Sequence, residues 1–490
     1  MRARIRTGRA TSLIFVSSLL ASVGGINRAS AENEEAPPAA AEDQATPPAP
    51  GAHKPAAEAT ETTGDLESAP APEEAKTPSF TVESHGWRLS IEGRMNSFVS
   101  YGWGNYQPTN VPDGDMSSIV GGGGFHIQQQ RDASGNFHTL RIRNGFVGNV
   151  LTFNLSRNVT QTTTLTAHMS LWSDVETNLQ VYSDAITWMQ EGYLQLEGPW
   201  GSFTAGRQLA LFSRGAVEID FNYMHGYGLG FPCNFDGVHP TCGMIGFGVL
   251  FPFFRSGLLY STPSLGGFTL AAGIYDPVIL AGKWERVVTP TAELEAAFTR
   301  PIGRRGMFKL FASGIWQQLG AAGNPPMPGG MPDNRAVANK KVTQYGGAAG
   351  ARLELGPVRV GATGHYGRGL GFFYAQENSE AAAYSAMDTS DPRDGDLRAF
   401  RGFYGQLMLV LGKIDVAGGA GVSQLVPLPF DNTSTTHLPK QNLGVSAGVF
   451  FHIRDYLVYS IDYFDGQSTW WGTSFTQRVH AINTGITMTF

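Results

Sequence analysis

The last eleven residues, 480–490, read HAINTGITMTF, and large or apolar side chains recur there at every second position: Phe490, Met488, Ile486, Thr484 and Ile482. A period of two is that of a β-strand with one apolar and one polar face. The strand also ends the chain on an aromatic residue. This strand alone does not decide whether its apolar face meets a protein core or a lipid bilayer, so the rest of the sequence is needed.

The same alternation recurs in nearly every segment after residue 80. In TAELEAAFT (291–299), for example, Leu294 and Phe298 oppose Glu293 and Glu295. We predict sixteen strands, at residues 88–101, 139–149, 162–173, 188–197, 202–209, 254–262, 268–275, 289–299, 307–317, 342–355, 358–367, 400–411, 414–423, 442–452, 456–465 and 476–490.

The connections between these strands alternate in length. Those after the odd strands are mostly long, such as 210–253, and those after the even strands are mostly tight turns; the one near 150–161 is the exception. One rim of long loops and one of short turns is typical of an outer-membrane barrel. We therefore predict an all-β fold, a transmembrane antiparallel up-and-down β-barrel of about sixteen strands, with a disordered N-terminal extension.

A barrel in lipid must close, because an open edge would leave backbone groups unpaired in hydrocarbon. The last strand then pairs with the first, its apolar side faces lipid, and Phe490 falls at the periplasmic interface, where aromatic belts lie. The alternative is a large soluble β-sandwich, which rarely has this loop asymmetry. The longest apolar run, CGMIGFGVLFPFF (242–254), is too short and glycine-broken for a transmembrane helix.

The N-terminal 79 residues are not expected to join the barrel. Residues 1–31 combine an arginine-rich start, a short apolar run and the Ala29-Ser30-Ala31 site of a signal peptide cleaved before Glu32. Residues 32–79 are rich in Ala, Pro and Glu, with 11 acidic residues and 2 lysines. We expect them to form a disordered periplasmic linker, and residues 80–490 to form the barrel domain.

Several motifs resemble those of the Gram-negative general porins. These are RNGFVGN (143–149), GPWGSFTAGRQLALFSRG (198–215), FRSGLLYSTPSLGGFTLAAGIYD (254–276), the first strand LSIEGRMNSFVSY (89–101) and the terminal strand. The resemblance covers residues 88–276 and the C-terminus. It implies a sixteen-stranded homotrimer in the outer membrane, inserted by the barrel-assembly machinery with Phe490 as the assembly signal, among outer-membrane lipid and lipopolysaccharide.

In that family the third external loop folds into the lumen and carries acids that face basic residues on the wall. The matching loop here is 210–253. The implied pore-constriction residues are Glu218, Asp220 and Asp236 on the loop, with Arg94, Arg143 and Arg207 on the wall. One departure is that Gln190 and Glu191 stand where a basic residue often occurs, so the basic wall is expected to be thinner.

The two cysteines, Cys233 and Cys242, both fall in this loop. Because the periplasm is oxidising, we predict a disulfide between them. The alternative is a metal site with His225 and His239, whose spacing does not match usual ligand sets. We therefore predict no metal and no cofactor.

The leading functional hypothesis is a water-filled channel for passive diffusion of small hydrophilic solutes and ions. A substrate-selective channel for anions or sugars is the alternative, with Arg359, Arg401 and Trp316 as candidate lumen residues. A structural or adhesive barrel is a third class. An enzyme is not expected: Asp431 and His437 lie in one loop, but no spacing singles out a catalytic group. Partners are expected to include peptidoglycan, through residues 32–79, and no nucleic acid.

Overall fold

The computed structural model describes residues 80–105, 136–146, 148–173, 175, 187–221, 243–250, 252–277, 286–303, 306–320, 340–372, 382–384, 391–433, 438–474 and 476–490. Its strands are β1 (Phe80–Ser84), β2 (Trp87–Asn105), β3 (Asn136–Arg143), β4 (Asn149–Asn158), β5 (Thr164–Ser173), β6 (Thr187–Gly198), β7 (Gly201–Leu209), β8 (Phe254–Ser261), β9 (Phe268–Tyr275), β10 (Arg286–Val287), β11 (Thr291–Ile302), β12 (Gly306–Gly320), β13 (Lys341–Leu355), β14 (Val358–Arg368), β15 (Ala399–Leu411), β16 (Ile414–Val426), β17 (Pro439–Arg454), β18 (Leu457–Trp470) and β19 (Thr476–Thr489). A short helix, α1 (Arg214–Glu218), precedes β8.

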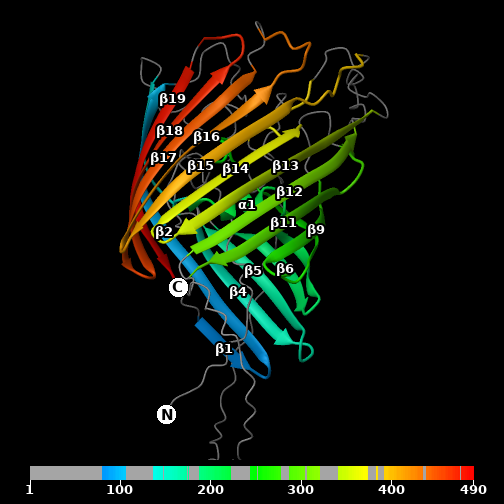
Figure 1. The fold of residues 1–490 in the computed structure, drawn as a ribbon, viewed down its shortest axis with the longest axis vertical. Coiled ribbons are helices and arrows are strands. Elements are labelled where there is room, and N and C mark those ends of the chain that lie inside the picture. The colour runs from blue at the N-terminus through cyan, green and yellow to red at the C-terminus, as the bar shows by residue number, and fades with distance from the viewer. Residues whose placement is uncertain are drawn as a thin grey trace, which may run out of the picture. The chain divides into compact units, whose positions relative to one another are not determined.

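These strands form one closed antiparallel wall (Figure 1). β3 and β4 both pair with β2 and share one place in the wall, while β1 and β10 are short additions. Sixteen wall strands remain, each beside its neighbour in the chain, and β19 closes the ring on β2. The predicted strand number and closure are confirmed. No helix in the described part of the chain is long and apolar enough to cross a membrane.

Alternation sorts the side chains between the two faces of the wall. On β11, Leu294 is 63% exposed while Glu293 is 1% exposed; on β19, Ile486 is exposed and Asn483 is buried. Large apolar side chains therefore cover the outside and polar ones the inside, the reverse of a soluble protein. This is the pattern expected when the outer face meets lipid.

Aromatic side chains mark two levels on the outer face. On β12, Phe308 lies near Phe298 at one level and Trp316 is exposed at the other. Eight residues of strand span about 27 Å, or about 20 Å along the barrel axis at a tilt of about 40°. That is close to the height of the apolar band of an outer-membrane barrel.

The predicted second strand, 139–149, is wrong in its extent. The wall strand runs through β3, breaks at residues 144–148 and continues as β4 to Asn158. Asparagine side chains bridge the break: Asn149 Oδ1 accepts from Asn96 N at 2.6 Å, and Asn96 Oδ1 accepts from Gly145 N at 2.6 Å. The unusually long connection predicted at 150–161 is therefore a turn at residues 159–163, which removes the exception in loop length.

The chain enters the wall through a hairpin. His85 and Gly86 both have positive φ (51° and 79°), which makes the tight turn that folds β1 back on β2. Phe80 pairs with Ile91, so β1 occupies the lower edge of β2 while β19 occupies the edge above it. In Figure 1, β1 and the C-terminus lie at the same end of the barrel.

Candidate functional site

The described parts of the connection from β7 to β8 turn into the barrel, while the prediction for residues 210–253 as a whole stays a prediction. These parts are 210–221, 243–250 and 252–253, and residues Ala210–Val217 are all buried. Ser213, with φ 64°, makes the bend before α1. Phe212 N donates to Glu293 Oε2 at 2.7 Å, and Ser213 N donates to Ser313 Oγ at 3.0 Å. These bonds attach the start of α1 to the inner face of β11 and β12.

Two buried ion pairs strengthen this attachment. Arg214 of α1 pairs with Glu295 of β11, and Arg255 of β8 pairs with Glu293. Glu293 and Glu295 both point inward because they are two residues apart on the same strand. Taking such charges out of water is costly, and losing one member of a buried pair typically costs 3–5 kcal/mol. The pairs therefore fix where α1 can lie.

The loop also reaches the opposite wall. Phe221 N donates to Gln406 Oε1 at 2.8 Å, and Gln406 Nε2 donates to Ile219 O at 2.6 Å. Farther along, Gly248 N donates to Ser423 Oγ at 2.8 Å. Gln406 and Ser423 belong to β15 and β16, which lie seven and eight places from β7 around the sixteen-strand ring. The loop thus crosses the whole lumen.

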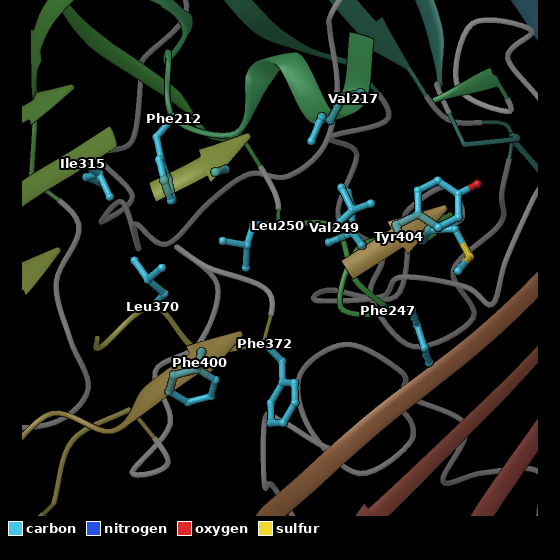
Figure 2. Packing of buried hydrophobic residues seen from close by; sticks show 14 of the residues in the cluster. Phe212, Val217, Phe247, Val249, Leu250, Ile315, Leu370, Phe372, Phe400 and Tyr404 are labelled. Carbon is cyan, nitrogen blue, oxygen red and sulfur yellow. The ribbon is translucent and has the colours of Figure 1, made fainter. Parts of the chain in front are cut away.

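Apolar packing holds the described parts of this loop, 210–221 and 243–250, against the wall. Figure 2 shows loop residues Phe212, Val217, Phe247, Val249 and Leu250 gathered with wall residues such as Ile315 and Tyr404. Each such buried side chain contributes about 1.5–3 kcal/mol. Gly421 permits the close approach, since a Cβ there would lie 2.0 Å from Phe247 O.

A second inward segment joins the same apolar cluster. It lies between β14 and β15 and supplies Leu370, Phe372 and Leu397. Gln344 Nε2 on β13 donates to Gly369 O at 2.6 Å and attaches this segment to the wall. The sequence analysis did not expect a second inward segment, although the apolar GLGFF (369–373) in a long polar loop was a usable signal.

The predicted wall arginines do not share one environment. Arg143 is fully buried, and its Nη2 donates to Ser100 Oγ at 2.8 Å and to Asn483 Oδ1 at 3.1 Å. Asn483 in turn donates to Asp462 at 2.6 Å. Arg143 therefore belongs to a polar network within the wall. Arg94 is half-buried on the inner face of β2, beside the inward-facing Asn96.

Arg207 lies on the outer face of the wall, unlike Arg94 and Arg143, which face inward. The register pairs it with Gly192 and Ser256, each two residues from the outward-facing Leu194 and Leu258. Its Nε donates to Gln190 O at 3.0 Å. The expectation that Arg207 faces the loop acids is therefore not met. A β-bulge beside it, between Ser170 and Leu171, turns the side chains of Gln190 and Glu191 inward, where both are buried.

The loop acids are only partly described. Glu218 ends α1, lies 3.8 Å from Arg214, and its side chain is 39% exposed. Asp220 follows and is buried. Asp236, Cys233 and Cys242 lie outside the described residues, so their predicted roles stay predictions, as does the alternative metal site with His225 and His239. In the described part of the chain no three His, Cys, Asp or Glu side chains come together to hold a metal ion.

Of the three residues named for a selective lumen, only Arg359 faces inward, where its Nε lies 3.5 Å from Glu354. Arg401 bonds Gln424 on the outer face, and Trp316 is 44% exposed there. The expectation that Arg401 and Trp316 line the lumen is wrong. Which of two alternating side chains faces inward depends on how the strand pairs with its neighbours. The structure instead brings Lys309 and Arg352 opposite each other on β12 and β13.

Asp431 has a structural partner. Arg398 donates two hydrogen bonds of 2.8 Å to its carboxylate, and Leu428 N donates a third at 2.7 Å. Burial alone would raise the pKa of Asp431, but the hydrogen bonds outweigh it and the pKa lies below its ordinary value. The ion pair ties the segment before β15 to the one after β16. His437 lies outside the described residues.

Comparisons with known proteins bear on the fold. No protein-family model and no curated protein matches this sequence. Among solved structures, the outer membrane channel DcaP of Acinetobacter baumannii matches with a TM-score of 0.57 at 12% identity, over 83% of this chain and 99% of that one. An anion-selective porin from Comamonas acidovorans matches at 0.53 and 11%, over 82% and 100%.

A third structure, Salmonella typhi OmpF in complex with daunomycin, matches at 0.50 and 9% identity, over 84% of this chain and 100% of that one. At such identities the likeness concerns the fold. The chain has the fold of the sixteen-stranded outer-membrane porins.

Proposed function

We propose that the protein is an outer-membrane porin, a water-filled channel through which small hydrophilic solutes and ions diffuse passively. The observation that carries this proposal is the loop of residues 210–221, fixed across the lumen by Arg214–Glu295 and by Gln406. A rigid body inside a polar-lined barrel narrows the pore without a moving gate.

The aperture is expected between α1 and the strands on the other side of the ring. α1 packs on β11 and β12, and the strands opposite these are β19 and β2, with β5 and β6 beyond. We expect Arg94 on β2 to face the Glu218 end of α1. Opposed charges across a narrow opening orient dipolar solutes and filter ions by sign.

A planar-bilayer recording of the purified protein tests this proposal. We expect stepwise, ohmic single-channel conductance that scales with salt concentration, and retention of solutes above a size limit in liposome swelling. Correctly folded protein with zero conductance would overturn the proposal and would support a structural or adhesive barrel instead.

The second candidate is a channel selective for anionic solutes. Lys309 and Arg352 are cross-strand neighbours, and Arg359 lies on the next strand, so three cations face the lumen with Glu354. Arg352 also lies 4.9 Å over the ring of Phe221 at the end of the α1 segment. A saturable block of ion current by an organic anion would favour this candidate over a general channel.

Other parts of the proposal rest on the sequence. We include a signal peptide cleaved before Glu32, a Cys233–Cys242 disulfide, and a periplasmic linker at 32–79 that approaches peptidoglycan. We also include insertion by the barrel-assembly machinery into outer-membrane lipid and lipopolysaccharide, and assembly as a homotrimer. Mass spectrometry of the mature protein, with and without reduction, tests the cleavage site and the disulfide together.

A further inference from the structure

We infer that His168 determines the ion selectivity of this pore, by adding a positive charge to the lumen wall when its ring is protonated. This inference rests on the proposed channel function. His168 was not among the residues singled out from the sequence. It lies on β5, where Met169 faces outward and Ser170 and Trp172 are buried inside, so the His168 side chain belongs to the inner face.

The neighbours of His168 determine which tautomer its neutral ring adopts. The register places Asn154 of β4 and Tyr193 of β6 directly beside it. With the amide oxygen of Asn154 facing the ring, at 2.7 Å from Nδ1, the neutral ring carries its proton on Nδ1 and donates it to Asn154. Nε2 is then left with a lone pair.

That lone pair points at a carboxylate. His168 Nε2 lies 3.7 Å from Glu191 Oε2, and the two side chains are 14% and 10% exposed. Two acceptors face each other while the ring is neutral, and a proton on Nε2 converts the contact into an ion pair. The Tyr193 ring stacks on His168 at 4.4 Å between centroids with an interplanar angle of 11°, which holds the ring plane and favours a cation.

One added proton on the ring of His168 changes the balance of charge on this part of the wall. Two carboxylates lie near His168. Glu191 on β6 is 3.7 Å from its Nε2, and Glu92 on β2 interacts with it electrostatically. Arg94 lies two residues from Glu92 on the inner face of β2. Arg214 of α1 also interacts electrostatically with Tyr193. Arg207, on the outer face, interacts with Glu191.

With His168 neutral, the charged groups named on this part of the wall are two carboxylates, Glu92 and Glu191, and one inward-facing arginine, Arg94. Protonation of His168 removes that excess of negative charge at the aperture. Cations are expected to be favoured when the ring is neutral, and the preference should move toward anions when the ring is protonated at lower pH.

Reversal potentials under a KCl gradient, measured from pH 8 to pH 5 in planar bilayers, test this. Wild type should shift toward the chloride equilibrium potential as the pH falls. His168→Gln keeps a donor for Asn154 but does not titrate, and should stay at the high-pH value throughout. His480→Gln is the matched control: His480 lies on the outer face of β19, bonded to Tyr463 at 2.8 Å, and its loss should leave the titration intact.

Glu191→Gln gives a second test that keeps His168. Without the carboxylate, the protonated ring loses its ion-pair partner, and the dependence of selectivity on pH should differ from that of the wild type. A pH shift that persists in His168→Gln, or a wild-type channel whose selectivity does not respond to pH, would overturn the inference. Absence of conductance in wild type would instead remove the proposed function.

Discussion

The ring of Phe490 lies on Gly93, and the two residues exchange both backbone hydrogen bonds: Gly93 N donates to Phe490 O at 2.7 Å and Phe490 N donates to Gly93 O at 2.9 Å. A Cβ on Gly93 would lie 2.3 Å from the tip of the ring. Phe490 pairs with Gly93, and Phe80 of β1 pairs with Ile91 on the same edge of β2. Only Glu92 lies between these two pairing positions. The end of the chain thus completes the wall at a defined position.

Changing either partner of this contact should impair assembly more than conduction. Phe490→Asp or deletion of Phe490 removes the ring, and Gly93→Ala forces it out of place. We expect a several-fold lower yield of folded, heat-modifiable barrel in the outer membrane, with normal conductance in the barrels that form. Gly347→Ala is the control, because a Cβ there meets only Ser313 O at 3.6 Å. Equal folding yields for all variants would contradict the prediction.

Breaking the Arg214–Glu295 pair should loosen the loop in the lumen. Glu295→Gln removes the nearer of the two carboxylates beside the buried Arg214 guanidinium and leaves only Glu218, at a cost of up to about 3–5 kcal/mol. We expect a lower thermal unfolding temperature and noisier, larger single-channel currents. Arg478→Gln is the control: it breaks a pair with Asp465 in which Arg478 is 53% exposed, where the effect should stay within about 1 kcal/mol. Unchanged current noise in Glu295→Gln would mean that the pair does not hold the loop.

Charge changes at the aperture should move selectivity in opposite directions. Neutralising Glu218 leaves more positive charge at the opening and should shift the reversal potential toward anions. Arg94→Gln should shift it toward cations. Arg207→Gln is the matched control, because Arg207 lies on the outer face and its loss should have little effect. If Arg207→Gln shifts selectivity as much as Arg94→Gln, the aperture is not where we place it.

The Arg398–Asp431 pair should stabilise the loops at that end of the barrel in a pH-dependent way. The pKa of Asp431 is lower in the folded protein than its unfolded value of about 3.9. Its stabilisation is therefore complete above about pH 4 and is lost as the pH falls through the folded pKa. Amide hydrogen exchange of residues 391–398 and 427–433 should be steady from pH 8 to 5, after correction for intrinsic rates, and faster at pH 3.

Asp431→Asn should give the faster exchange at every pH, at a cost of about 1.5–3 kcal/mol for the charged hydrogen bonds. Asp391→Asn is the control. Asp391 pairs with Arg393 two residues away, so it does not connect the two segments. Protection that survives in Asp431→Asn would show that other contacts hold the loops.

Removing residues 32–79 should leave conductance and trimer yield unchanged and reduce co-sedimentation with peptidoglycan. A flexible chain of about 48 residues reaches roughly 40 Å, and its prolines and like charges extend it further. A rise in conductance on removal would instead mean that the segment enters the lumen. No change in either assay would mean that it is a passive leader.

Period-two alternation alone determined most of the wall. It set the number of strands, their approximate limits and the separation of neighbouring side chains onto two faces, as for Leu294 and Glu293, because backbone pleating is local. The alternation of long and short connections predicted a barrel whose apolar face meets lipid, and closure of that barrel placed the C-terminal strand at the seam. The connection 210–253 could be recognised as the candidate lumen loop from its length and from the motifs of the strands on either side of it.

Tertiary structure decided what each inward side chain meets. Arg214 reaches Glu295, Arg143 is buried among Ser100 and Asn483, and the loop crosses to Gln406, all contacts between residues at least forty positions apart. The break at 144–148 and the bulge at Gln190 shift the phase of alternation, and only pairing with neighbouring strands reveals such a shift. Arg207 and Arg401 were misplaced for that physical reason: a strand's sequence fixes that its side chains alternate, but its partners fix which of them face the lumen.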